Sequence, residues 1–112
     1  MDPEKPNLVI VDGVRTPFCK MGTDLAGTSA VELGRTAVNA LLTRTGIDPD
    51  LVDETILGNV CQPADAGNIA RVVALRSGIP ESKPAVTVHR NCASGFESLT
   101  TAYEKMAADR GE

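Results

Sequence analysis

Aromatic residues are scarce in this chain of 112 residues: they make up 3% of it, and tryptophan is absent. The core must therefore be built from aliphatic side chains and alanine. A net charge of -4 argues against a nucleic-acid partner or an anionic membrane surface. No apolar run approaches the ~20 residues that a membrane span requires. The polar, proline-containing residues 1–6 also lack the apolar region of a signal peptide.

Cysteine is sparse as well, and its three positions are widely separated: Cys19, Cys61 and Cys92. An odd number without any Cys-x-x-Cys spacing argues against a disulfide scaffold or a zinc site, and it fits a reducing, cytoplasmic setting. The sequence has neither Gly-x-Gly-x-x-Gly nor Gly-Lys-Ser/Thr, so no phosphate-binding loop is expected. The carboxylates are dispersed, and we expect no metal site.

What the chain does contain is an alternation of short apolar runs and helical patterns. Apolar runs predict buried strands over residues 8–14, 55–60 and 85–88. The order strand, helix, strand, helix, strand, helix predicts an α/β fold with a parallel sheet. We interpret residues 1–6 as a flexible tail and residues 7–112 as one incomplete domain.

Local signals place the helices between these strands. Ser29 to Glu32 forms a capping box that opens the first helix, and Gly46 stops it. Its expected apolar face is Leu33, Ala37, Ala40 and Leu41. Asp48 with Pro49 predicts a further short turn, and a second helix is expected from about residue 68 to residue 77. Gly58 interrupts a strand, where another backbone or a ligand can come close.

The most informative stretch runs from residue 85 to residue 110, where a cysteine stands between a strand and a helix. Beyond the strand, apolar residues recur at spacings of three, four and three, as on one helix face: Phe96, Leu99, Tyr103 and Met106. The unpaired N–H groups and the dipole of a first helical turn favour a thiolate. Cys92 is therefore the candidate nucleophile, although a free cysteine is more commonly a buried packing residue.

Two residues compete as the N-cap of this last helix. Asn91 as the cap would place Cys92 in the first turn, whereas Ser94 with Glu97 forms a capping box that begins later. We expect the earlier start, because it brings the thiolate to the helix N-terminus. Gly95 then removes a side chain just beyond the cysteine and lets a substrate approach the backbone.

The segment around Cys92 resembles the nucleophile segment of thiolases, the acetyl-CoA acyltransferases: Asn91-Cys92-Ala93-Ser94-Gly95-Phe96-Glu97-Ser98. The opening from Val9 to Phe18, with Arg15-Thr16-Pro17, resembles the first strand and turn of that family and favours it over the related ketoacyl synthases. Two further matching segments follow in the expected order: Gly58-Asn59-Val60 and Asn68-Ile69-Ala70-Arg71. The resemblance extends from Leu8 to Gly111.

This resemblance implies a layered αβαβα fold with a mainly parallel sheet, of which the chain is a partial β-α-β-α-β-α unit. It implies that Cys92 takes an acyl group from a coenzyme A thioester, with its own backbone N–H helping to hold the oxyanion. Coenzyme A and acyl-CoA would be substrates in fatty acid metabolism, with no bound cofactor and no metal. A homo-oligomer completed by the remainder of a thiolase subunit is expected.

Other polar residues carry both a functional and a structural interpretation. His89, the only histidine, is interpreted as a packing or hydrogen-bonding residue rather than as the base for the cysteine. Arg15 is a candidate for contact with the phosphates of coenzyme A, but a loop anchor or an ion pair is favoured. The same alternatives apply to Asn68 and Arg71. We expect Cys19 and Cys61 to be small packing residues.

The resemblance places the rest of the mechanism beyond residue 112, namely the activating histidine and a second cysteine that acts as acid and base. The last residues end where a helix would end, which suggests truncation at an element boundary. Three interpretations follow. The chain is part of a thiolase that is active only with the remainder, or an inactive thiolase-derived interaction module, or an independent enzyme with His89 as base. The third is the weakest, because that pair lacks an orienting partner.

Overall fold

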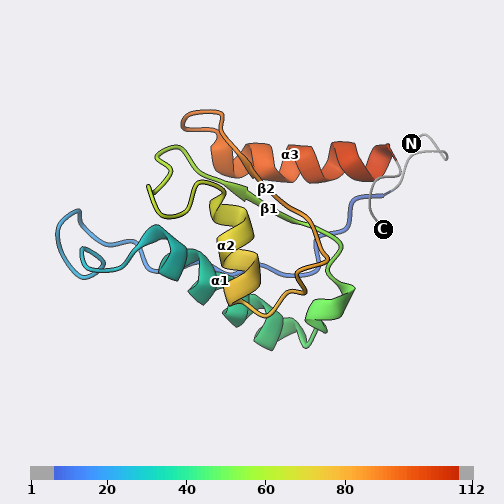
Figure 1. Cartoon of the computed structure of the whole chain (residues 1–112), viewed down its shortest axis with the longest axis horizontal. Coiled ribbons are helices and arrows are strands. Elements are labelled where there is room, and N and C mark those ends of the chain that lie inside the picture. Colours follow the sequence, from blue (N-terminus) through green and yellow to red (C-terminus); the bar gives the residue numbers. More distant parts are fainter. Residues whose placement is uncertain (1–6, 109–112) are drawn as a thin grey trace.

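Two parallel strands with helices on both sides form the frame of the computed structural model, which describes residues 7–108. In chain order the elements are α1 (Ala30–Thr45), the 3-10 helix η1 (Pro49–Leu51), β1 (Thr55–Gly58), α2 (Ile69–Arg76), β2 (Ala85–Val88) and α3 (Ser94–Ala107). Helix α3 lies along one side of the strands, whereas α2 lies on the other side with α1 packed against it (Figure 1). This is the expected partial α/β unit, without its first strand.

Helix boundaries follow the local signals of the sequence. The Ser29 hydroxyl accepts the Glu32 N–H at 3.1 Å and so caps α1 where predicted, which is one half of a capping box, while the Glu32 carboxylate pairs with Arg35 at 3.3 Å. Gly46 ends α1 with φ +69°, a left-handed conformation that glycine adopts without strain. The Asp48 carboxylate caps η1, and Pro49 is its first residue. These three predictions are confirmed.

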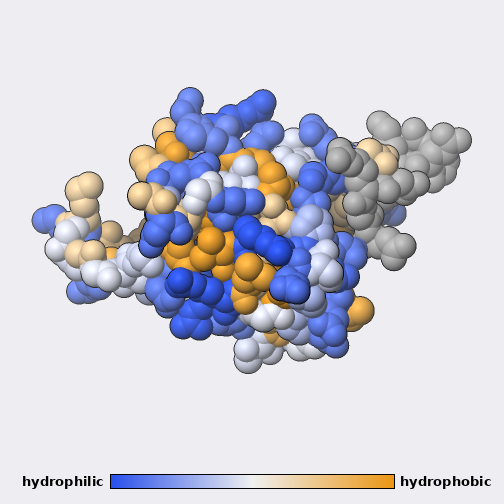
Figure 2. Space-filling view, viewed as in Figure 1, coloured by the Kyte–Doolittle hydropathy of each residue, from blue (hydrophilic) through white to orange (hydrophobic). Residues whose placement is uncertain are grey.

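The core is small and aliphatic, as the shortage of aromatic residues predicts. Its buried apolar residues are Val31, Ala66, Ile69, Ala70, Val73, Ala74 and Ile79. Most of them come from α2 and the residues just before it, so α2 is the central helix. In Figure 2, further hydrophobic residues gather near the middle of the drawn face, where Figure 1 places α2 and the strands.

The face of α1 that meets α2 differs from the predicted one. Val31 is buried, Val38 packs against the same cluster, and Gly34 approaches so closely that a Cβ there would lie 2.8 Å from a methyl carbon of Val73. By contrast, Ala40, which belonged to the expected face, is exposed. Helix α1 turns its glycine toward α2, because the missing side chain allows the closest approach.

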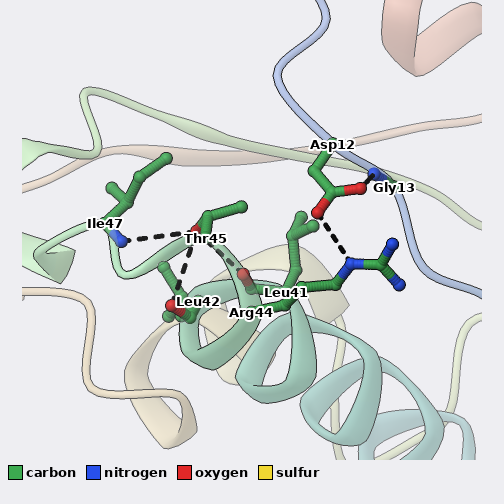
Figure 3. Close-up of polar contacts among 7 residues, drawn as sticks. All are labelled: Asp12, Gly13, Leu41, Leu42, Arg44, Thr45 and Ile47. Atoms are coloured by element: carbon green, nitrogen blue, oxygen red, sulfur yellow. Dashed lines mark hydrogen bonds and ion pairs between the residues drawn. The ribbon is translucent and has the colours of Figure 1, made fainter.

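Residues 8–14 do not form the expected strand. Val9, Ile10 and Val11 are 70–73% exposed, and the sheet described over residues 7–108 consists of β1 and β2. An apolar run becomes a strand only when a neighbouring strand pairs with its backbone. Instead, the segment is held by Asp12, whose carboxylate lies 2.8 Å from the Arg44 guanidinium in the last turn of α1 (Figure 3). Strand β1 also ends two residues earlier than predicted.

Hydrogen bonds join the start of α2 to β2. The Asn68 side chain caps α2 and donates to the Ala85 carbonyl at 3.1 Å. The Thr87 hydroxyl donates to the Asn68 side-chain oxygen at 2.7 Å and accepts the Ala70 N–H at 3.0 Å. This network accounts for Asn68 as a structural residue.

Two arginines also anchor the backbone. The Arg71 guanidinium donates to the carbonyls of Glu81 and Lys83, both at 2.8 Å, which holds the approach to β2 against α2. Arg15 donates to the carbonyl of the next residue at 2.8 Å and lies 4.5 Å from the centre of the Phe18 ring. Both contacts agree with the structural interpretation of these side chains.

An apolar groove runs between the N-terminal segment and α3. It measures about 310 Å³ and is lined by Leu8, Ile10, Phe96, Leu99, Thr100 and Tyr103. Phe96 is 74% exposed and Leu99 is 49% exposed. The apolar stripe of α3 is therefore only partly covered within residues 7–108.

This groove predicts that the isolated chain of 11.7 kDa self-associates. Leaving a large apolar side chain in water forfeits about 1.5–3 kcal/mol, against a total stability of about 5–15 kcal/mol for a typical domain. Phe96→Ser should reduce the associated fraction, measured by light scattering after size exclusion. Phe18→Ser is the matched control, since Phe18 is exposed outside the groove. A monodisperse monomer with a cooperative thermal transition would contradict the prediction.

Candidate active site

The candidate site lies where β1 and β2 end side by side. Because the strands are parallel, Gly58 stands opposite Val88 at their carboxyl ends. The next residue, Asn59, donates its N–H to the Val88 carbonyl at 3.0 Å. After Val88, the end of β2, the chain turns through residues 89–93 and enters α3. Cys92 belongs to this turn, between strand and helix as the sequence predicted.

Neither predicted start of α3 is correct. The helix begins at Ser94 with Ala93 as its N-cap, so Cys92 precedes the first turn and Ser94 is not the cap. Asn91 adopts φ +46°, a left-handed conformation that asparagine tolerates better than most residues and that takes the chain off the helical path. The N-cap residue Ala93 makes no side-chain hydrogen bond to the first turn of α3.

The Ser94 side chain closes the turn instead. It is 4% exposed, and its hydroxyl accepts the Arg90 N–H at 2.8 Å and donates to the Asn91 carbonyl at 2.7 Å. Sequence reasoning missed this role. The available signal was a serine that follows an asparagine by three residues, since such hydroxyls commonly bond back to the nearby backbone.

Two side chains add to this turn. His89 accepts the Asn91 N–H through Nδ1 at 3.2 Å, which confirms its interpretation as a hydrogen-bonding residue. The Arg90 guanidinium lies 3.2 Å from the Glu97 carboxylate and so links the turn to α3. Arg90 is 70% exposed, and an ion pair of this kind contributes at most about 1 kcal/mol.

Cys92 is exposed among residues 7–108. Cys61 is exposed too, which makes its expected packing role wrong, while Cys19 is half-buried. In the part of the chain that the structure describes, no three metal-binding side chains gather. Over the same residues, none of the helices has the length and apolarity to cross a bilayer.

Comparison with known proteins identifies this arrangement. The family described as "Thiolase, N-terminal domain" matches residues 8–112. A 3-ketoacyl-CoA thiolase of Serratia proteamaculans is 44% identical over 101 residues, which cover 90% of this chain and 23% of the relative. The thiolase of Aliivibrio fischeri is 41% identical with the same coverage. The chain thus spans about a quarter of the length of these relatives.

Comparison with solved structures also indicates a thiolase fold. The crystal structure of a Bacillus anthracis acetyl-CoA acetyltransferase has a TM-score of 0.88 and 34% identity, over 93% of this chain and 26% of that one. The Acat5 thiolase from Ascaris suum, in complex with coenzyme A, has a TM-score of 0.83 and 29% identity, over 88% and 26%. The fold is therefore part of a thiolase fold. The chain belongs to the thiolase family and matches its N-terminal domain.

Ser94→Ala should lower the free energy of unfolding by about 1–3 kcal/mol, because it removes a buried hydroxyl together with its hydrogen bonds to the Arg90 N–H and the Asn91 carbonyl. Ser98→Ala is the matched control on the same helix, since its hydroxyl donates only back to the Gly95 carbonyl. Denaturant unfolding of the two variants checks the difference. Equal losses would show that the Ser94 hydroxyl does not stabilise the turn.

Proposed function

We propose that this chain supplies the nucleophilic cysteine of a thiolase-type acyltransferase. Cys92 would exchange an acyl group with coenzyme A, converting 3-oxoacyl-CoA and CoA to acyl-CoA and acetyl-CoA, or running the reverse condensation. The observation that carries the proposal is an exposed cysteine at the strand-to-helix turn of a chain that belongs to the thiolase family. The coenzyme A bound to the Ascaris relative supports the choice of substrate.

The chemistry follows from the properties of a thiol. In thiolysis the Cys92 thiolate attacks the 3-oxo carbonyl of 3-oxoacyl-CoA, a carbon–sulfur bond forms, and the carbon–carbon bond to the acetyl-CoA unit breaks, so that acetyl-CoA leaves as an enolate and takes up a proton. With acetyl-CoA the thiolate attacks the thioester carbonyl, and the CoA thiolate is the leaving group. The resulting acyl-cysteine is close in energy to the CoA thioester, so a CoA thiol can take the acyl group back.

Activity requires more than this chain, in our proposal. The described part provides the nucleophile, and the proton acceptor and the second acid–base group come from the remainder of a thiolase subunit. His89 is a poor candidate for the base, because its Nδ1 is engaged by the Asn91 N–H inside the turn. We further propose a cytoplasmic, homo-oligomeric enzyme without a bound cofactor.

A second candidate function rests on the apolar groove beside α3. Exposed Phe96 and Leu99 would suit an inactive, thiolase-derived interaction module that binds a partner through this face. The two candidate functions differ in whether they require Cys92, because a binding module does not need a nucleophile. Binding that survives Cys92→Ser in a protein without acyl transfer would favour the module.

Cys92 should be the acylated residue. The test protein is a hybrid in which residues 8–112 replace the matching segment of the Serratia proteamaculans thiolase. Incubation with acetyl-CoA followed by peptide mass spectrometry should place the acetyl group on Cys92. Cys92→Ser should abolish turnover with the fold retained, since a serine hydroxyl is far less ionised than a thiol. Cys61→Ser is the matched control, and acetylation of Cys61 with Cys92 unmodified would defeat the proposal.

His89→Ala tests the assignment of the base. If the proton acceptor lies elsewhere, the hybrid should lose less than about tenfold in kcat, compared with the 10²–10⁴-fold that general-base catalysis typically contributes. His89→Asn retains a side chain capable of hydrogen bonding and should be nearer to wild type. A loss of several thousandfold in both variants would instead support the independent cysteine–histidine enzyme.

A further inference from the structure

Gly58 is in contact with the backbone on both sides of the turn that carries Cys92. On the strand side it is the β-ladder partner of Val88, the last residue before the turn. On the helix side a Cβ at Gly58 would lie 2.3 Å from the Ser94 carbonyl oxygen and 2.8 Å from the Gly95 nitrogen. One glycine therefore touches the chain just before the turn and just after it.

This contact differs in kind from the other close glycine contact in the chain. At Gly34 the obstructing atoms are the methyl groups of the Val73 side chain, which can rotate or shift. At Gly58 the obstructing atoms belong to the backbone of Ser94 and Gly95, so relief requires movement of the whole first turn of α3. The buried Ser94 hydroxyl would transmit that movement, because it is bonded to both Arg90 and Asn91.

We propose that Gly58 is a positioning residue for Cys92. The absence of a side chain lets the start of α3 rest on the end of β1, which fixes the distance between the two ends of the turn. Since ordinary contacts begin at 3.4 Å, any larger residue would displace the helix start by about 1 Å, and a misplacement of this size can cost on the order of 10²-fold in rate. The importance of this effect for catalysis rests on the proposed function of Cys92.

Alkylation by iodoacetamide tests the geometry without any need for catalysis. Peptide mass spectrometry follows the labelling rates of Cys92 and of Cys19, which precedes α1 in the chain, in the full chain and in the hybrid thiolase. Gly58→Ala should change the ratio of the two rates by at least about fivefold, because the added Cβ displaces the Cys92 turn and Cys19 belongs to a distant part of the sequence. In the hybrid it should lower kcat on the order of 10²-fold, with KM for acetoacetyl-CoA nearly unchanged.

Two glycine variants serve as controls. Gly34→Ala also introduces a close contact, but between α1 and α2, so it should lower the thermal midpoint and leave the labelling ratio unchanged. Gly67→Ala places its Cβ in open space and should alter neither quantity. An unchanged ratio in Gly58→Ala, or an equal change in Gly34→Ala, would overturn the inference.

Two further outcomes remain decisive. If wild-type Cys92 is never acylated, the proposed function fails, whereas the labelling ratio still decides whether Gly58 positions the turn. If Gly58→Ala does not fold, hydrogen exchange of the unmodified chain replaces it. The Asn59 amide, bonded to Val88, and the Ser94 amide, bonded to Asn91, should then open with the same free energy, since the contact at Gly58 joins the strand end to the helix start. Independent opening of these amides would overturn the inference.

Discussion

The pairing of β1 with β2 is the interaction on which the other elements depend. Two strands of four residues have little stability alone and need packed helices on their faces. Strand β1 contacts the helices on both sides of the sheet through two neighbouring residues. Leu57 packs against the cluster centred on α2, and Gly58 lies against the start of α3. Near the other end of α3, Lys105 pairs with Glu54 just before β1, at 2.5 Å.

Around the candidate nucleophile, the backbone provides most of the order. The turn is defined by a left-handed asparagine, a buried serine hydroxyl and the end of a strand, while Cys92 itself remains exposed. A cysteine held in this way keeps its side chain available for a reactant. Under the proposed function, proton transfer and the binding of coenzyme A would come from other parts of a thiolase.

Local signals predicted the elements whose boundaries depend on neighbouring residues. Ser29, Gly46 and Pro49 marked α1 and η1 correctly, and β2 matches its prediction at both ends. Prediction failed where a missing pairing strand or a competing hydrogen bond decides the outcome. Residues 8–14 have the composition of a strand but no pairing strand among the described residues, and α3 starts late because Ser94 bonds back into the turn. Cys92 was found from its place between strand and helix, whereas the contact partner of Gly58 required the structure.

The hydroxyl of Thr87 has a consequence for how the sheet is assembled. Its neighbours in β2, Val86 and Val88, have nearly the same shape as Thr87. A pairing shifted by one residue turns each side chain to the opposite face, so apolar packing alone would distinguish poorly between the two pairings. A shift would present a valine to the start of α2 and leave the buried Ala70 N–H without its acceptor. The Thr87 hydroxyl therefore favours the observed register, because only in that register does it accept the Ala70 N–H.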